Sequence, residues 1–381
     1  MIDRATFLQG LLATSTVTPA IPQTQVLQQL NLGVNMPLSG AYGNYGRDVL
    51  KGVQAAIDET NKLLPSLTKS YGVRPFDDQN SGAIATSNVL VAAADSTIIA
   101  MIGDLTLDVT MTALPQYANS GFALVVPTVT ADKLTQQGYH NVFRLPATDS
   151  SEGQLFANAV LRGKPRMNVV GVIVDGDYGL EVGRAFVAQA KGNKQNAQLL
   201  TLESNADVAD STAIIARQSP GYIFLAGLPQ KLGPIAVALR NGGYTGDFGM
   251  SDSFYTADVA KTFGKELQGS LVASVMPPLD RVPSISVYFH DYQNEVGAIT
   301  AFSAYGYAAA QLLIQAQQRG NASNRFQLLT QLQEGGSYPL IVGQYSFNSN
   351  GDPTLPNIYL FTMGPDGFTF AKSAFANGFV V

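Results

Sequence analysis

The chain has 381 residues, a formal net charge of −5, no cysteine and only two histidines, His140 and His290. Its length is typical of two or three domains, and a hydrophobic content of 46% is enough for a core in each. A nonspecific nucleic-acid binder needs a basic surface, which this composition does not supply. The cysteine and histidine counts exclude disulfides, thiolate metal sites and histidine-rich metal sites, so we expect no metal and no cofactor.

The first 30 residues have the features of a weak export signal. Arg4 is followed by a short apolar run that contains Leu11 and Leu12, and small residues continue up to Ala20. We therefore predict a periplasmic or otherwise exported protein, in which residues 1–30 are an export signal or a disordered tail. No later segment has the roughly 20 uninterrupted apolar residues of a membrane span.

From residue 30 to residue 126, apolar strands alternate with helices. Apolar residues at Leu30, Leu32, Val34 and Met36 alternate with other residues, which predicts a strand. The same reasoning predicts further strands at 98–102 and 122–126, and helices at 50–61, 87–94 and 110–119.

The same alternation restarts after Asp149. Predicted helices lie at 152–162, 181–191, 211–218, 232–241, 284–295, 301–318 and 325–333. Predicted strands lie at 169–174, 198–202, 222–226, just before Asp252, and at 271–275, 344–347 and 358–361. Strands that alternate with helices indicate βαβ units, so we predict an α/β fold with two doubly wound parallel-sheet lobes.

Polar residues follow several of the predicted strands. In open α/β sheets, ligands bind beyond the carboxyl ends of the strands. Polar residues at these positions include the candidate ligand-binding residues Tyr45, Thr106, Thr128, Thr130, Tyr178 and Asp252. Hydroxyl and backbone N–H groups would hold a carboxylate, and an acidic side chain would hold an ammonium. Taken singly, such residues are more often helix caps or turn formers, so only their convergence favours a site.

Six segments also occur in a recognisable order. They read LGVNMPLSGAYGNYG at 32–46, GVQAAIDE at 52–59, FDD at 76–78, PTVTADKLT at 127–135, RLPATD at 144–149 and DGDYG at 175–179. This series, over about residues 31–375, resembles the leucine/isoleucine/valine-binding proteins. These are type I periplasmic solute-binding proteins that serve ABC transporters.

The resemblance implies a role for each candidate residue. Thr130 and the backbone near Thr128 would hold the ammonium and carboxylate region of the ligand. Asp252 lies where the family places an acidic partner for the ammonium, and Tyr45 and Tyr178 would form walls of the pocket, Tyr178 from the second lobe.

The chain departs from the family pattern in the same region. Thr106 stands where the family usually has a serine pair, Leu228 takes a tyrosine position, and Asp252 is shorter than the common Glu. These departures leave the identity of the ligand open.

The resemblance also implies that Phe302 would contact the ligand from the first lobe.

The resemblance also implies three lobe crossings, near Asp149, Met276 and Pro356. Three hinge strands would let the lobes rotate as rigid bodies. The predicted first lobe comprises 31–148 and 276–356, and the predicted second lobe comprises 149–275 and 357–381.

The predicted function is extracytoplasmic binding of a small solute, with a neutral or aliphatic amino acid favoured, and its delivery to the membrane permease of an ABC transporter. We expect a monomer that does not bind nucleic acid. We expect no enzyme activity, because the sequence has no G-x-S-x-G, P-loop or G-x-G-x-x-G motif. The alternatives are a ligand-sensing receptor module and binding of an amide, urea-like or aromatic acid solute.

Overall fold

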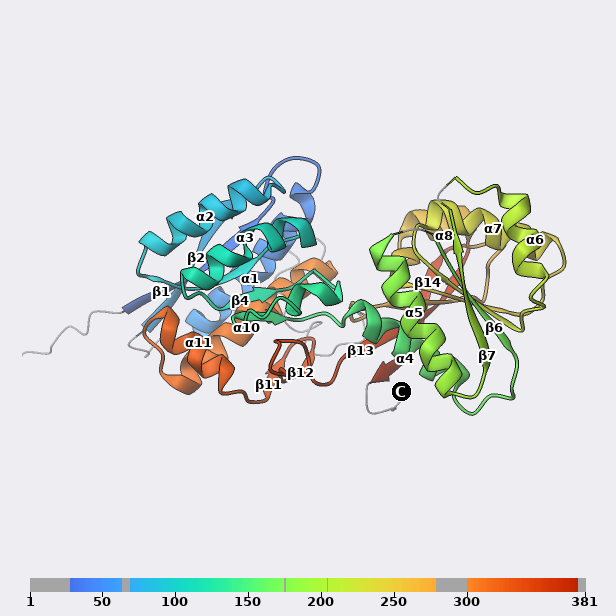
Figure 1. Cartoon of the computed structure of the whole chain (residues 1–381). Helices are drawn as coiled ribbons and strands as arrows, with labels where there is room; N and C mark the ends of the chain where they lie inside the picture. Colours follow the sequence, from blue (N-terminus) through green and yellow to red (C-terminus); the bar gives the residue numbers. More distant parts are fainter. Residues whose placement is uncertain (1–27, 64–68, 175, 204, 279–299, 376–381) are drawn as a thin grey trace, which may run out of the picture.

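The computed structural model describes residues 28–63, 69–174, 176–203, 205–278 and 300–375. They form two lobes, each a sheet covered by helices (Figure 1). The segment up to residue 27, which covers most of the predicted export signal, and the predicted helix at 284–295 lie outside the described residues. None of the helices in the described ranges is long and apolar enough to span a membrane.

The first lobe contains a five-stranded parallel sheet with the strand order β2-β1-β3-β4-β5. Its strands are β1 (Gln28–Met36), β2 (Lys69–Asp77), β3 (Ile98–Gly103), β4 (Leu124–Val126) and β5 (Val142–Arg144). Its helices are α1 (Gly43–Leu63), α2 (Gly82–Ala94), α3 (Leu107–Asn119), α10 (Ala301–Gly320) and α11 (Arg325–Gln333), with the short η1 (Asp132–Thr135). Separate apolar cores lie under α1, α10 and α11 and under α2 and α3, so the sheet is covered on both faces.

Strand β1 lies between β2 and β3, and its polar residues are as buried as its apolar ones. Asn31 and Asn35 alternate with the apolar residues that predicted the strand, and both are at most 1% exposed. The Asn31 side chain donates to Thr97 Oγ1 at 2.6 Å, and that of Asn35 donates to the Tyr117 hydroxyl at 2.7 Å. The alternation therefore reflects two buried faces, one of which contains hydrogen-bonded amides.

The second lobe contains a seven-stranded sheet with the order β14-β13-β10-β9-β8-β6-β7. Its strands are β6 (Asn168–Val174), β7 (Asn196–Leu202), β8 (Tyr222–Ala226), β9 (Asp247–Met250), β10 (Leu271–Ser274), β13 (Asn357–Gly364) and β14 (Gly367–Phe375). Its helices are α4 (Asp149–Leu161), α5 (Asp177–Gly192), α6 (Val208–Ala216), α7 (Pro229–Asn241) and α8 (Ala257–Phe263), with the short η2 (Asp252–Phe254). The α/β class with two parallel-sheet lobes is confirmed, and an antiparallel hairpin, β13 and β14, forms one edge.

The described elements that the sequence did not predict are mostly short. They are β2, β5, β11 (Tyr338–Leu340), α8, η1, η2 and the edge strand β14, of which β2 and β14 are each nine residues long. The predicted strand at 344–347 only overlaps β12 (Gly343–Tyr345), which pairs with β11. Three-residue strands are too short for a recognisable alternation, and β14 mixes Thr, Lys and Ser with its apolar residues.

The chain moves between the lobes more than once, as the colours of Figure 1 show: the blue first lobe also contains orange segments, and the green second lobe ends in red strands. One connection joins β5 to α4, and another joins β12 to β13. They lie side by side, because Arg144 N donates to Gly351 O at 2.9 Å. The lobe boundaries at 148/149, 275/276 and 356/357 stay predictions.

Helices α1 and α10 come from distant parts of the chain and pack at very close range. A Cβ atom at Gly52 would lie 1.9 Å from Ser303 O, and one at Gly306 would lie 2.2 Å from Val49 O. Real Cβ atoms do not approach a carbonyl oxygen so closely, so both crossing points require glycine.

We expect Gly52→Ala to lower the free energy of unfolding by about 1–3 kcal/mol, because the added methyl group forces the two helices apart. Urea denaturation of the purified protein measures the change. Gly192→Ala is the matched control, because a Cβ there meets only Gln189 Nε2 at 3.6 Å. Equal losses in the two variants would contradict the close-packing argument.

Candidate functional site

The seven predicted site residues lie beyond strand ends or at a helix start, in two groups. In the first lobe, Tyr45 follows β1 in the first turn of α1, and Phe302 is in the first turn of α10. Thr106 follows β3, and Thr128 and Thr130 follow β4. The second-lobe group consists of Tyr178 and Asp252, which follow β6 and β9.

Tyr45 and Phe302 form an aromatic pair. Their ring centroids are 4.9 Å apart with an angle of 49° between the planes, and Tyr45 is 45% exposed. A paired ring that is open to solvent can cover an apolar group or meet a cation with its face. The structure therefore brings together these two predicted residues, although they are far apart in the sequence.

Thr106 and Thr128 use their hydroxyl hydrogens inside the protein. Thr106 Oγ1 donates to Asn80 Oδ1 at 3.0 Å, and Thr128 Oγ1 donates to Leu105 O at 2.8 Å. A hydroxyl has one hydrogen to donate, so in this arrangement neither side chain donates to a ligand carboxylate. Their oxygens remain acceptors, which suits a ligand N–H group better.

Thr130 lies where the two lobes meet. Its carbonyl oxygen accepts from Asp149 N at 3.0 Å and from Arg144 Nη1 at 2.7 Å. The Thr130 side chain also bonds the Asp149 carboxyl group, and this bond partly opposes the rise in the pKa of Asp149 that burial causes. Thr130 therefore contacts the start of α4, the first helix of the second lobe.

Arg144 fixes the loop that contains Thr130. Its side chain is fully buried, and its Nε and Nη2 atoms donate to Asp352 Oδ1 at 2.9 and 2.7 Å. Nη1 donates to the carbonyl oxygens of Thr130 and Ala131, and Nη2 donates to Thr135 Oγ1. One guanidinium group thus holds both ends of the loop against the connection between β12 and β13.

Tyr178 and Asp252 form the second-lobe group with a third residue, Glu152. The Tyr178 hydroxyl donates to Asp252 Oδ1 in a short hydrogen bond and lies 3.3 Å from Glu152 Oε2. Glu152 Oε1 accepts from Asp252 N at 2.8 Å. Helix α4 therefore contributes a carboxyl group that contacts both predicted residues.

Glu152 was missed by the sequence analysis, although a signal was present. It is fully buried and precedes the core residues Leu155 and Phe156 by three and four positions, so it lies on the apolar face of its helix. A carboxyl group in an apolar stripe is uncommon, and it points to a buried polar cluster.

Burial raises the pKa values of the carboxyl groups in this region. Burial, together with the charges of Asp252 and Glu181, raises the pKa of Asp149 to about 8, against a hydrogen bond from Thr130. Burial raises the pKa of Glu152 well above its usual range, with the charge of Asp252 as the next cause. Desolvation also raises the pKa of Asp252, against hydrogen bonds from Tyr178 and Ser253. At neutral pH, these three carboxyl groups are therefore not all ionised.

Within the described part of the chain, no hydrogen bond joins the Tyr45–Phe302 pair to the Tyr178–Asp252 pair. The lobes meet instead beside them, where Asp132 N donates to Glu181 Oε2 at 3.2 Å and Lys133 pairs with Asp177 at 3.0 Å. Among the same residues, no group of three or more His, Cys, Asp or Glu side chains has the arrangement of a metal site.

The family model for periplasmic binding proteins matches residues 29–367. The chain belongs to that family. Within it, the chain is a type I protein of the leucine/isoleucine/valine-binding group, as the ordered motifs predicted. The family consists of solute-binding proteins.

Among its curated relatives is the Leu/Ile/Val-binding protein homolog 1 of Brucella melitensis, which is 25% identical over 88% of this chain and 91% of the relative. A putative branched-chain amino acid ABC transporter from Rhodospirillum rubrum has the same fold, with a TM-score of 0.79, 22% identity, and coverage of 90% of this chain and 100% of the other. An ABC transporter substrate-binding protein from Desulfitobacterium hafniense, in complex with Leu, has a TM-score of 0.73, 20% identity, and coverage of 90% and 100%.

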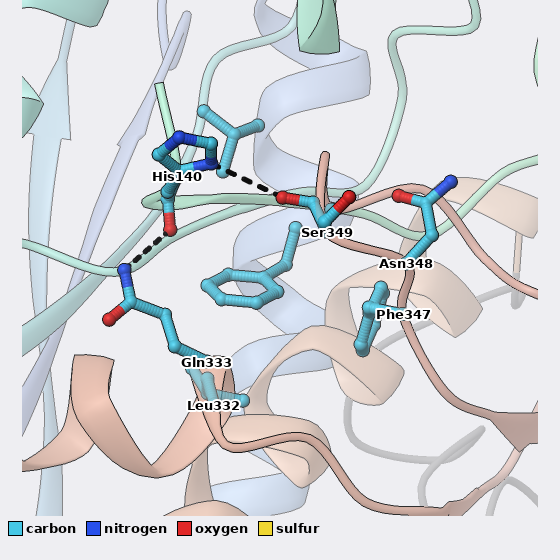
Figure 2. A pocket seen from close by; sticks show the side chains of 9 residues that line it. His140, Leu332, Gln333, Phe347, Asn348 and Ser349 are labelled. Atoms are coloured by element: carbon cyan, nitrogen blue, oxygen red, sulfur yellow. Dashed lines mark hydrogen bonds between the residues drawn. The ribbon is translucent and has the colours of Figure 1, made fainter. Parts of the chain in front are cut away.

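Two pockets of this periplasmic binding protein lie away from the predicted residues. One, of about 520 Å³, is bordered by His140, Gln333 and Phe347 in the first lobe (Figure 2). In it, Gln333 Nε2 donates to His140 O at 2.9 Å, and the His140 ring contacts Ser349 O at 3.2 Å. The other, of about 630 Å³, lies between α6 and α7. Neither pocket contains any of the seven predicted residues.

We expect Asp352→Ala to lower the free energy of unfolding by about 3–5 kcal/mol, because Arg144 is left buried without its anion. Thermal and urea denaturation measure the loss. Asp177→Ala is the matched control, since its ion pair with Lys133 is exposed and worth at most about 1 kcal/mol. A control loss as large as that of Asp352→Ala would contradict the role of the buried pair.

Proposed function

We propose that this protein binds a small amino-acid-like solute between its two lobes outside the cytoplasm and delivers it to the permease of an ABC transporter. The observation that supports this proposal most directly is the Tyr178–Asp252 pair at the carboxyl end of the second sheet. It combines an acid with a phenol, and it has no basic side chain bonded to it within the described ranges. An ammonium group would supply the missing positive charge.

The first-lobe residues complement this acid. In the proposed complex, Tyr45 and Phe302 cover the apolar side chain of the solute. The hydroxyl oxygens of Thr106 and Thr128 accept from its ammonium group, and backbone N–H groups near Thr130 hold its carboxylate. A free amino acid of about nine heavy atoms has enough contact for a micromolar dissociation constant if both of its charges are paired.

The proposed mechanism is closure of the two lobes around the solute. A ligand that contacts both lobes stabilises the closed arrangement by its differential affinity, and the permease can then distinguish the loaded protein from the empty one. The predicted lobe boundaries near residues 149, 276 and 356 supply the hinge in this scheme. A monomer is sufficient, because the predicted contacts come from one chain.

We also propose a purely binding role, without catalysis, and export of the chain from the cytoplasm. Membership of a family of periplasmic solute-binding proteins supports both. Asp252 disfavours an aromatic acid as the solute, because such a molecule brings no cation to a partly buried carboxyl group that has none among the described residues. A sensing receptor would bind in the same way and differ only in its partner.

We expect a neutral amino acid such as L-leucine to stabilise the protein in a thermal-shift screen. At 100 times the dissociation constant, the gain is about 2.7 kcal/mol. Asp252→Asn removes the negative charge that pairs with the ammonium and abolishes the shift, whereas Asp258→Asn, an exposed acid on α8, keeps it.

The same screen includes acetamide, urea and benzoate. A shift with benzoate and none with any amino acid would support the alternative solute class and reject the proposed ammonium site. An Asp252→Asn variant that retains the full amino-acid shift would reject the role of Asp252.

A further inference from the structure

Glu152 lies directly behind the proposed ligand site and is shielded from solvent. It is fully buried, whereas Tyr178 and Asp252 are both partly accessible. A ligand in the site would therefore touch Tyr178 and Asp252 but not Glu152. Any effect of Glu152 on binding must act through these two residues.

Glu152 contacts both residues at the same time. Its Oε1 atom accepts from Asp252 N at 2.8 Å, and its Oε2 atom lies 3.3 Å from the Tyr178 hydroxyl. Tyr178 has one hydrogen and donates it to Asp252 in the shorter bond. Two carboxyl groups thus face one phenol that can donate to only one of them.

The surroundings of Glu152 contain more acids than bases. Helix α4 itself adds Asp149, which is 1% exposed and whose Oδ1 atom has no hydrogen-bond partner. Helix α5 adds Glu181, and its Asp177 is paired with Lys133. The cation on β14, Lys372, donates to Ala159 O near the far end of α4.

No Lys, Arg or His of the described ranges forms an ion pair with Glu152, Asp149 or Asp252. An ionised carboxylate without a cation is strongly disfavoured in a buried position, and two neighbouring carboxyl groups rarely ionise together. A shared proton resolves both problems. The fully buried group is the one that keeps it, since the partly accessible Asp252 retains contact with water.

We propose that Glu152 keeps its proton at neutral pH and acts as a positioning residue for Asp252 and Tyr178, so that the site presents one negative charge to the single ammonium group of its ligand. This inference rests on the proposed function for the identity of the ligand. The charge state of Glu152 itself does not depend on it.

The pH dependence of folding tests the charge state without any ligand. A carboxyl group whose pKa is raised in the folded protein binds more protons there than in the unfolded chain. Stability then falls as the pH rises from the unfolded pKa, about 4.3 for Glu, towards the folded pKa. Glu152→Gln removes this loss, because glutamine stays neutral.

We therefore expect Glu152→Gln to become progressively more stable, relative to the wild type, as the pH rises from about 5 to about 8. This range begins just above the unfolded pKa of Glu, which is about 4.3. Urea denaturation at each pH measures the difference. Glu266→Gln, an exposed glutamate of the same lobe, should show no such trend. A difference between Glu152→Gln and the wild type that stays constant over this range would overturn the proposal.

Titration with L-leucine at pH 7 tests the positioning role. Glu152→Ala removes the acceptor for Asp252 N and should weaken binding by about tenfold or more, and Glu152→Gln should recover most of that loss because its amide mimics the protonated acid. A glutamine variant as weak as the alanine variant would show that the charge of Glu152 is needed and would overturn the proposal. If the wild type itself does not bind L-leucine, the proposed solute is wrong, while the pH series still decides the charge state.

Discussion

The buried guanidinium group of Arg144 is the contact on which the arrangement of the proposed site depends. It bonds Asp352 in one connection between the lobes, the loop 130–135 after β4, and, through Thr130, the start of α4. These segments come from three separate parts of the sequence. Because the positive charge has no access to water, it requires all of its acceptors, and this requirement defines the position of the loop relative to the second lobe.

The sequence was sufficient to predict most of the fold because the long elements have clear periods. Strands β1, β3, β6 and β8 and helix α10 were all found where the apolar patterns predicted them. The hairpin of β13 and β14 could not be oriented in the same way, since strand direction depends on which neighbour supplies the pairing partner. Short elements such as β5 and η1 are defined by tertiary contacts, not by a local pattern.

The site was predictable to the extent that it follows strand ends. Tyr178 and Asp252 are bonded to each other, and Tyr45 packs against Phe302. The hydrogen-bond roles of Thr106 and Thr128 were not predictable, because they depend on which carbonyl or amide oxygen lies nearby. The position of Glu152 on the apolar face of α4 could be read from the sequence, but its contacts with Tyr178 and Asp252 could not. Residue type and order therefore indicate a site, while the direction of each proton needs the three-dimensional structure.

The close crossing of α1 and α10 has a consequence for how the molecule is assembled. Gly52 of α1 packs against Ser303 of α10, and α10 follows β6 to β10 of the second sheet in the sequence. The first lobe therefore cannot be completed until most of the second lobe has been synthesised. Such long-range contacts carry a large loop-closure entropy and slow the folding reaction. During synthesis, the early part of the first lobe therefore stays partly uncovered until its missing helices are made, and its exposed apolar surface is open to aggregation in that interval.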